Sequence, residues 1–445
     1  MTSVVVGLGK TGASCLRYLA KHGIAAAATD SRASPPGLAE LGPLSRTLDL
    51  RLGGFDFSLL DGASRLLISP GVSLDEPIAQ AARARGIEVL GDVELFAREV
   101  RAPVIGITGT NGKSTVTSLV ASMASAAGRR VLAGGNLGVP ALDLLEENAP
   151  DLYVLELSSF QLETTSSLDL QAAVVLNVTA DHMDRYATVQ DYARAKQRIF
   201  AHAATMVLNA DDPLVAAMGG AASPATRAIK TFSTQRADAD YCLLRSRGET
   251  LLARDGVAIL DVKRLKITGL HNAANALAAL ALADAAGLPL PASLSALEAF
   301  PGLRHRSQWI ADVAGVRYVD DSKGTNVGAT IAAVDGMQGP LLLIAGGLAK
   351  GQDFTPLAAA FKDKVRQVVL IGRDALAIER ALAGVCATQR AASMQDAVAA
   401  AARAARPGDT VLLSPACASL DMFRDYGHRG DVFAAAVRAL AERSP

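Results

Sequence analysis

Short runs of apolar residues alternate along the chain with longer stretches whose apolar positions follow a helical period. Each run ends in a glycine or a polar turn, which is typical of a buried parallel strand that leads into a helix. The clearest runs are Val4–Val6, Leu66–Ile68, Val104–Ile107, Tyr153–Leu157, Ala173–Val178, Leu341–Ala345, Val368–Ile371 and Thr410–Leu413. This pattern predicts an α/β protein with several open sheets.

The chain divides into three segments, each of which opens with its own strand and turn. The first turn begins at Gly7, the second strand and turn at Gly106, and the third near Val316. A length of 445 residues suits three domains of ordinary size. We therefore expect domains at residues 1–92, 93–302 and 303–445.

Charge and hydropathy narrow the class of protein. The chain has 44 Lys and Arg against 44 Asp and Glu, and this balance argues against nucleic-acid binding through bulk positive charge. No charged leader precedes an apolar stretch, and no apolar run reaches the roughly 20 residues that span a bilayer. We expect a soluble, cytoplasmic and monomeric protein that binds neither nucleic acid nor membrane.

The first glycine turn is a candidate nucleotide site. Gly7–Gly12 reads GxGxxG after a strand, and Asp30 follows at the end of the next apolar run. Such glycines let a phosphate approach the N-terminus of a helix, and the acid accepts hydrogen bonds from a ligand. The adjacent Arg32 adds a donor that fits a uracil or ribose edge or a 2′-phosphate. The turn alone therefore suits an NAD enzyme, a nucleotide-sugar enzyme or a plain structural turn.

The second turn is the sharpest motif in the sequence. The strand Val104–Ile107 leads into Gly109-Thr110-Asn111-Gly112-Lys113-Ser114, and an apolar helix follows. Backbone N–H groups of such a loop wrap phosphates, while its lysine neutralises phosphate oxygens and its serine binds magnesium. The spacing is shorter than the common GxxxxGK[ST] loop. We predict an ATP-binding loop made of Gly109, Thr110, Asn111, Gly112, Lys113, Ser114 and Thr115.

Two polar residues follow neighbouring strands and are candidate ligands for magnesium. Glu156 ends the run at Tyr153–Leu157, and His182 lies just past the run at Ala173–Val178. A phosphoryl-transfer site needs such ligands beside cations that offset the charge on phosphate. Lys196, in contrast, has the setting of an ordinary solvated helix lysine.

The phosphate loop and further motifs in all three segments resemble those of the Mur ligase family. In chain order they are GGNLG (134–138), ELSSFQLE (156–163), NVTADHMDRY (177–186), GLHNAANA (269–276), GLRHR (302–306), DDSKGTN (320–326), GGLAK (346–350) and LLSPACASLDMF (412–423). Four of them, namely ELSSFQLE, DHMDRY, DSKGTN and SPACASLD, are most similar to those of the branch that adds D-glutamate.

This resemblance implies a fold and an activity. The expected fold has an N-terminal Rossmann-like domain, a central P-loop ATPase-like domain and a C-terminal Rossmann-like domain. The expected reaction joins D-glutamate to UDP-MurNAc-L-Ala, with ATP and Mg²⁺, through an acyl phosphate. The resemblance also implies that Lys196 is carbamylated, and an anion there suits a second magnesium better than an amine does.

The resemblance assigns further residues to each ligand. The UDP-sugar would contact Lys10, Thr11, Asp30, Ser31, Arg32, Ser69, Gly71 and Asn136. ATP would contact the loop and Asn272, Asn275, Arg306, Asp321 and Lys323. Glutamate would contact Thr325, Lys350, Ser419 and Tyr426. Catalysis would depend on Lys113, Glu156, His182 and Lys196, and the metal ligands would be Ser114, Glu156, His182 and Lys196.

The sequence departs from the family pattern at two places near the expected pocket for the incoming amino acid. Gly324 stands where alanine is usual, and Leu348-Ala349 replaces a frequent Asp-Gly. Selection between D- and L-glutamate, and the base that takes the proton of the amine, stay unassigned. Three other functions remain as alternatives: a related amide ligase with another substrate, an NAD-dependent dehydrogenase, and a nucleotide-binding regulator without catalysis.

Overall fold

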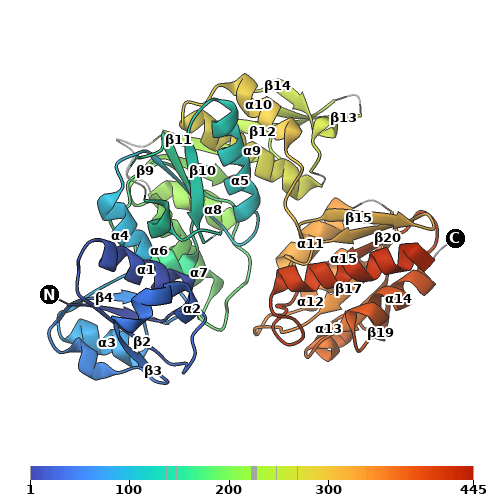
Figure 1. Ribbon diagram of the computed structural model, residues 1–445. Helices are drawn as coiled ribbons and strands as arrows, with labels where there is room; N and C mark the ends of the chain where they lie inside the picture. The colour runs from blue at the N-terminus through green and yellow to red at the C-terminus, as the bar shows by residue number, and fades with distance from the viewer. Residues whose placement is uncertain are drawn as a thin grey trace.

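The computed structural model describes residues 2–136, 138–145, 148–221, 228–246, 248–267, 269–337 and 339–443. These residues form three α/β units, each built on its own sheet (Figure 1). We call them the N-terminal lobe (strands β1 to β5), the central lobe (β6 to β14) and the C-terminal lobe (β15 to β20). In Figure 1 the chain runs from the blue N-terminal lobe through the central lobe to the red C-terminal lobe.

The N-terminal lobe is a parallel sheet with helices packed against its faces. The strand order is β3-β2-β1-β4-β5, and every neighbouring pair is parallel. Val4, Val5 and Val6 of the middle strand are fully buried, as their unbroken apolar run predicts. The elements are β1 (Thr2–Val6), α1 (Lys10–Lys21), β2 (Ala26–Asp30), α2 (Leu38–Leu41), β3 (Asp49–Leu52), β4 (Ala63–Ile68), α3 (Pro77–Ala84) and β5 (Glu88–Leu90).

The central lobe has a nine-stranded sheet in the order β14-β13-β12-β11-β10-β9-β6-β8-β7. Its strands are β6 (Val104–Thr108), β7 (Val131–Gly135), β8 (Leu152–Glu156), β9 (Leu170–Val175), β10 (Ala203–Asn209), β11 (Ala228–Ser233), β12 (Tyr241–Ser246), β13 (Glu249–Arg254) and β14 (Val257–Asp261). The sheet is parallel from β7 to β12, whereas β13 and β14 extend it by antiparallel pairing.

Three helices of the central lobe, α5, α7 and α9, carry predicted site residues, and Lys196 lies on α7. Helix α5 begins at Lys113, within the phosphate loop, and α9 packs beside it. Helix α9 buries apolar residues around most of its circumference, which is typical of a helix enclosed between a sheet and other helices. The helices are α4 (Asp92–Glu99), α5 (Lys113–Ala126), α6 (Ser159–Glu163), α7 (Val189–Gln197), α8 (Pro213–Met218), α9 (Leu270–Ala285) and α10 (Leu290–Ala299).

The C-terminal lobe has a six-stranded sheet in the order β15-β16-β20-β17-β18-β19. Only the edge strand β15 is antiparallel to its neighbour. The elements are β15 (Gln308–Val313), β16 (Val316–Asp320), α11 (Val327–Gly336), β17 (Leu341–Gly346), α12 (Thr355–Phe361), β18 (Val365–Ile371), α13 (Ala375–Ala381), β19 (Ala387–Arg390), α14 (Met394–Ala404), β20 (Thr410–Leu413) and α15 (Tyr426–Arg443).

The strand register of the central sheet brings three loops together. Ile107 of β6 lies opposite Glu156 of β8 on one side and Val174 of β9 on the other. Because all three strands are parallel, their carboxyl ends meet at one edge of the sheet, where ligands bind in open α/β sheets. The loops that follow these strands are therefore neighbours.

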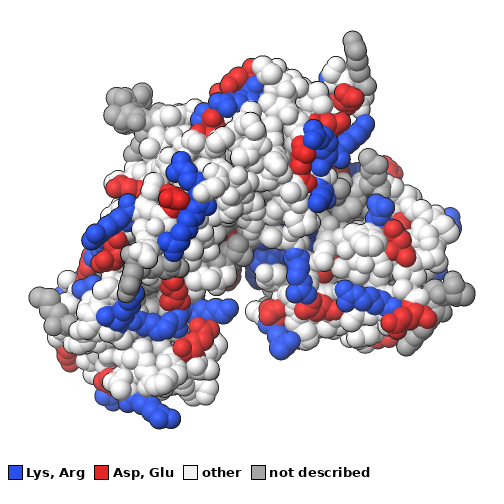
Figure 2. Space-filling view, turned by 45° about the horizontal axis from the view of Figure 1, so that its top comes forward, with Lys and Arg blue, Asp and Glu red and all other residues white. Residues whose placement is uncertain are grey.

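Each of the eight apolar runs lies wholly or partly on a strand of these sheets, so the predicted α/β class with several open sheets is confirmed. The antiparallel additions β13, β14 and β15 were not predicted. The exact domain limits at residues 92 and 302 stay a prediction. No helix among the described residues has the length and apolar character needed to cross a bilayer. Figure 2 shows positive and negative side chains interspersed over the face in view, in keeping with the balanced charge.

Candidate active site

The phosphate loop joins β6 to α5 and depends on two glycines. Gly109 and Gly112 have φ values of 149° and 88°, which favour glycine. A Cβ atom on Gly112 would lie 2.4 Å from Oδ1 of Asn275, so the loop approaches α9 closely only because this residue has no side chain. The backbone amide of Thr110 donates to the carbonyl oxygen of Asn177, which fixes the loop to the segment after β9.

Two lysines meet at the start of this loop. The Nζ atoms of Lys113 and Lys196 donate to the same carbonyl oxygen, that of Gly109, at 2.7 and 2.9 Å. Lys196 is only 1% exposed, and its amine also lies 4.2 Å from the ring centre of Tyr192. Burial lowers the pKa of Lys196 well below its usual value, and the neighbouring Lys113 adds to this effect. Burial therefore shifts Lys196 toward the neutral amine.

Glu156 ends β8 with one carboxylate oxygen bonded and one without a partner. Its Oε1 accepts a hydrogen bond of 2.6 Å from Nδ2 of Asn136, whereas the buried Oε2 has no hydrogen-bond partner. An unsatisfied buried carboxylate oxygen is costly, and it fits a cation ligand. Among the described residues no group of three His, Cys, Asp or Glu side chains could hold a metal alone. The hydroxyl of Ser114 stays a predicted further ligand for a divalent cation here.

His182 lies beyond β9 in a left-handed backbone conformation with φ of 57°. Its ring packs against Phe160, with ring centres 4.9 Å apart, and its Nε2 lies 3.8 Å from Oδ2 of Asp181. Burial lowers the pKa of His182, and the lysines around it act in the same direction. A neutral imidazole is the form that binds metal.

The C-terminal lobe adds cations to the same place. Arg306 donates from its guanidinium to Oγ of Ser114 at 2.7 Å, and burial lowers the pKa of this arginine. The amine of Lys323 lies 3.8 Å from the ring centre of Tyr426, and burial lowers its pKa to about 8. Charge on a phosphate chain at this point would be offset from two lobes.

These side chains line one cavity of about 410 Å³, which we call the central cavity. It includes every residue predicted for catalysis and metal binding, namely Lys113, Ser114, Glu156, His182 and Lys196. Of the predicted glutamate ligands it includes Thr325 and Lys350. Ser419 and Tyr426 are not among its lining residues. The ring of Tyr426 contacts the amine of Lys323, which does line the cavity, and Ser419 is buried.

A second cavity of about 530 Å³ lies between the N-terminal and central lobes, and we call it the N-terminal cavity. All eight residues predicted to contact the UDP-sugar line it: Lys10, Thr11, Asp30, Ser31, Arg32, Ser69, Gly71 and Asn136. The carboxylate of Asp30 is already occupied by protein donors. It accepts from the amide of Leu8 at 2.6 Å and from Nε and Nη2 of Arg32 at 2.8 and 2.7 Å. Asp30 thus orients both the glycine turn and Arg32.

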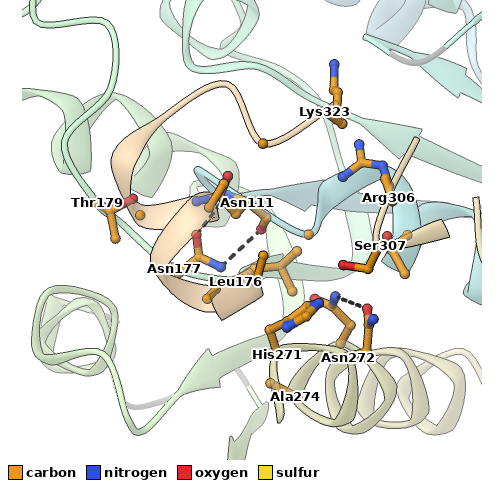
Figure 3. A pocket seen from close by; sticks show the side chains of 18 of the residues that line it. Asn111, Leu176, Asn177, Thr179, His271, Asn272, Ala274, Arg306, Ser307 and Lys323 are labelled. Atoms are coloured by element: carbon orange, nitrogen blue, oxygen red, sulfur yellow. Dashed lines mark hydrogen bonds between the residues drawn. The ribbon is translucent and has the colours of Figure 1, made fainter. Parts of the chain in front are cut away.

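A third cavity of about 280 Å³, the α9 cavity, lies between the phosphate loop, α9 and the C-terminal lobe. Figure 3 shows His271 and Asn272 on α9, with Asn111 and Asn177 on the opposite side of the cavity. Nδ2 of Asn275 donates to Oδ1 of Asn272 at 3.2 Å. The predicted ATP residues that line this cavity are Asn111, Gly112, Thr115, Asn272, Asn275, Arg306, Asp321 and Lys323. Its glycine cradle and amide groups fit a nucleotide.

Asp321 is buried beside this cavity and its pKa is raised to about 7 by burial. Its carboxylate accepts hydrogen bonds from Oγ of Ser414 and the amide of Ser307. A Cβ atom on Gly324 would lie 2.6 Å from Oδ2 of Asp321. The glycine that departs from the family pattern therefore gives this carboxylate room.

Two residues of the site were missed from the sequence. Asp181 lines the central cavity, and its Oδ1 lies 3.9 Å from Nζ of Lys350. Asn326 donates from Nδ2 to Oδ2 of Asp181 and to Oδ1 of Asn111, both at 3.2 Å. These contacts join the central and C-terminal lobes. The only local signal was the position of Asp181 directly before His182 and that of Asn326 at the start of a helix.

The chain matches three domain families in succession. Residues 1–91 match the Mur ligase MurD-like N-terminal domain, residues 107–283 the Mur ligase middle domain, and residues 305–417 the Mur ligase glutamate ligase domain. The chain is 56% identical over 441 residues to the UDP-N-acetylmuramoylalanine–D-glutamate ligase of Nitrosococcus oceani, covering 99% of this chain and 97% of the relative. It is 51% identical to the enzyme of the same name from Methylococcus capsulatus, covering 98% and 95%.

Solved structures agree with the fold. A pseudomurein peptide ligase type C from Methanothermus fervidus superposes with a TM-score of 0.65 at 18% identity, over 99% of both chains. The UDP-N-acetylmuramate-alanine ligase of Thermotoga maritima gives 0.63 at 19% identity, again over 99% of both chains. At such identities the likeness concerns the three-lobed architecture alone.

Proposed function

Since the chain belongs to the Mur ligase family, we propose that it joins the amine of D-glutamate to the alanine carboxylate of UDP-N-acetylmuramoyl-L-alanine, with ATP, in the synthesis of a peptidoglycan precursor. Relatives at 56% and 51% identity that carry this activity in their names support the choice of substrates, because they cover nearly the whole chain.

One observation carries the proposal: the three cavities adjoin in a row. The N-terminal and central cavities share Pro70, Gly71 and Asn136. The central and α9 cavities share Asn111, Gly112, Arg306 and Lys323. A nucleotide-sugar entering from one end and a nucleotide triphosphate from the other would therefore meet in the central cavity, beside the phosphate loop.

A carboxylate is a poor electrophile, so the first step activates it. An oxygen of the alanine carboxylate attacks the γ-phosphorus of ATP, and the bond from this phosphorus to the β-phosphate oxygen breaks. ADP departs, and the alanine carboxylate has become an acyl phosphate. Lys113 and Arg306 offset the charge that spreads over the transferred phosphoryl group. Mg²⁺ held by Ser114, Glu156, His182 and Lys196 would supply further positive charge at the phosphate oxygens.

Lys196 fits this site as a carbamate better than as an ammonium ion. Its nitrogen would add to the carbon of CO₂ and lose a proton, which gives a carboxylate-like anion. The burial that favours its neutral amine also favours this reaction, since the neutral form is the nucleophile. A carbamate would also remove the repulsion between Lys196 and Lys113, whose nitrogens share one carbonyl oxygen.

The incoming amino acid would enter from the C-terminal lobe. Lys350 and Thr325 line the central cavity and suit a carboxylate, and Ser419 and Tyr426 are proposed for the second carboxylate. The neutral amine then attacks the carbonyl carbon of the acyl phosphate, the bond to the phosphate oxygen breaks, inorganic phosphate leaves, and the nitrogen releases one proton to solvent as the amide forms. Contacts between the lobes, such as that of Asn326 with Asp181, help to exclude water that would hydrolyse the intermediate.

The experiment is phosphate release from a mixture of ATP, Mg²⁺, UDP-N-acetylmuramoyl-L-alanine and D-glutamate, with each component omitted in turn. We expect release only from the complete mixture. Replacing D-glutamate by L-glutamate, L-alanine or meso-diaminopimelate tests the related ligases. Release with another amino acid but not with D-glutamate would reassign the substrate, and binding of ATP without release in any mixture would favour a regulator.

A further inference from the structure

Arg429 lies in the first turn of α15 and is completely buried. Its guanidinium donates three hydrogen bonds. Nε bonds to Oγ of Ser322 at 2.9 Å, Nη2 to the carbonyl oxygen of Ser322 at 2.7 Å, and Nη1 to the carbonyl oxygen of Cys417 at 3.0 Å. The hydroxyl of Ser322 in turn donates to the carbonyl oxygen of Tyr426, one turn earlier on the same helix.

The charge of Arg429 has no counter-ion in direct contact. Among the described residues no carboxylate lies within 4.0 Å of its guanidinium, and its three acceptors are a hydroxyl and two backbone carbonyls. Burial lowers the pKa of Arg429 to about 10, which still leaves it charged at neutral pH. Its charge is offset through space by Asp320, Asp321 and Asp421, two of which lie in or beside the loop that holds Ser322.

The two bonded segments each lead to substrate residues proposed above. Ser322 lies between Asp321 and Lys323 in the loop after β16, which we call the nucleotide loop (320–325). Cys417 lies two residues before Ser419 in the loop after β20, which we call the amino-acid loop (414–419). The carbonyls that Arg429 holds are thus within one or two residues of side chains proposed for ATP and glutamate.

The two loops also touch directly, at a strained position. The amide of Ala416 donates to the carbonyl oxygen of Gly324 at 2.9 Å. Ala416 has a φ of 57°, a left-handed conformation that costs energy for a residue with a side chain. Such a conformation persists only where the surroundings fix it, and the bond from Arg429 to the next residue, Cys417, is part of those surroundings.

We propose that Arg429 is a positioning residue that locks the nucleotide loop to the amino-acid loop, so that ATP and the amino acid bind with mutual dependence. This inference rests on the proposed function for the identity of the two ligands. The planar guanidinium suits the task because it presents several donors in a fixed fork and spans both loops. A lysine reaches one loop at a time, and a methionine reaches neither with a donor.

The test compares Arg429→Lys and Arg429→Met with the wild type. Calorimetry gives the Kd of glutamate with and without a saturating non-hydrolysable ATP analogue, and steady-state rates give KM for all three substrates. We expect the analogue to tighten glutamate binding at least fivefold in the wild type and less than twofold in both variants. The KM values for ATP and glutamate should rise at least tenfold, while the KM for the UDP-sugar, bound at the other end, stays within twofold.

Arg438→Met is the matched control, because Arg438 is an exposed arginine of the same helix. Circular dichroism checks that each variant is folded. If neither Arg429 variant folds, Ser322→Ala replaces them as the test, and we expect it to raise the KM values for ATP and glutamate about threefold. Unchanged coupling in folded variants, or an equal rise in all three KM values, overturns the inference. Absence of phosphate release by the wild type would contradict the proposed function instead. The effect of the ATP analogue on the Kd of glutamate would still test the role of Arg429.

Discussion

The amines of Lys113 and Lys196 donate to one and the same acceptor, the carbonyl oxygen of Gly109, at 2.7 and 2.9 Å. Two ammonium groups that share one acceptor lie close enough to repel each other, and burial removes the water that would screen their charges. Burial lowers the pKa of both amines, and Lys113 lowers that of Lys196 further toward the neutral form, so an anion formed at Lys196 would relieve the repulsion.

Replacement of Lys196 by alanine should lower the ligation rate at least 100-fold, because the anion proposed at this position is lost. Short carboxylates such as formate or acetate should restore part of the rate by filling the same space. The measurement is phosphate release with and without about 100 mM of the carboxylate, a concentration suited to an anion that binds weakly. Arg194→Ala, an exposed change on the same helix, is the control. Full activity of Lys196→Ala would remove this lysine from the mechanism.

Glu156→Gln keeps the shape of the side chain and removes the charge that a divalent cation would contact. The Mg²⁺ concentration for half-maximal rate should rise at least tenfold, and kcat should fall at least 100-fold. A magnesium titration of the phosphate-release rate measures both, with Glu249→Gln, an exposed position in β13, as the control. An unchanged magnesium requirement would place the metal elsewhere.

Arg32→Ala should raise the KM for the UDP-sugar at least tenfold and leave the KM for ATP within twofold, because Arg32 lines only the N-terminal cavity among the three. Asp30→Ala should do the same and also destabilise the fold by about 1–3 kcal/mol, since it leaves the buried amide of Leu8 without an acceptor. Arg51→Ala, an exposed change in β3, is the control. Equal increases of both KM values would contradict the assignment.

Asp321→Asn should change how stability depends on pH. The pKa of Asp321 is raised from 3.8 to about 7 in the folded protein, so the unfolded chain ionises first as pH rises. Its contribution to the free energy of unfolding is fully present below about pH 4 and is lost by about 1.4 kcal/mol per unit up to about pH 7. The variant escapes this loss.

We therefore expect Asp321→Asn to exceed the wild type in Tm by clearly more at pH 8 than at pH 4.5, where only about 1 of the roughly 4 kcal/mol is lost, while its KM for ATP rises. Thermal unfolding followed by circular dichroism at both pH values measures the difference. Asp169→Asn, at an exposed carboxylate, is the control. A Tm difference that does not change between the two pH values would show that Asp321 is not the group that titrates.

The strands and the phosphate loop were predictable because their signals are local. An unbroken apolar run such as Val4–Val6 fixes a buried strand, and the glycines at 109 and 112 fix a turn that other residues resist. The edge strand β15 was not predictable, since five of its six residues, Gln308–Asp312, are exposed or only partly buried and the strand carries no unbroken apolar run.

Contacts between lobes could not be read from the sequence. Arg306 and Ser114 are 192 positions apart, and Asn326 and Asn111 are 215 apart, so no periodicity relates them. Lys196 shows the same limit in another form. Its helix α7 carries polar residues on several sides, and only the packing of Tyr192 and the phosphate loop reveals that this lysine is buried. Family resemblance pointed to it, and chemistry alone did not.

The sharing of Pro70, Gly71 and Asn136 by two adjoining cavities bears on how the protein could be inhibited. A single compound that carries a uridine-like group and an acidic group on one short tether could occupy both spaces at once. The second group would then bind at a high effective concentration, so two weak fragments would give one tight ligand.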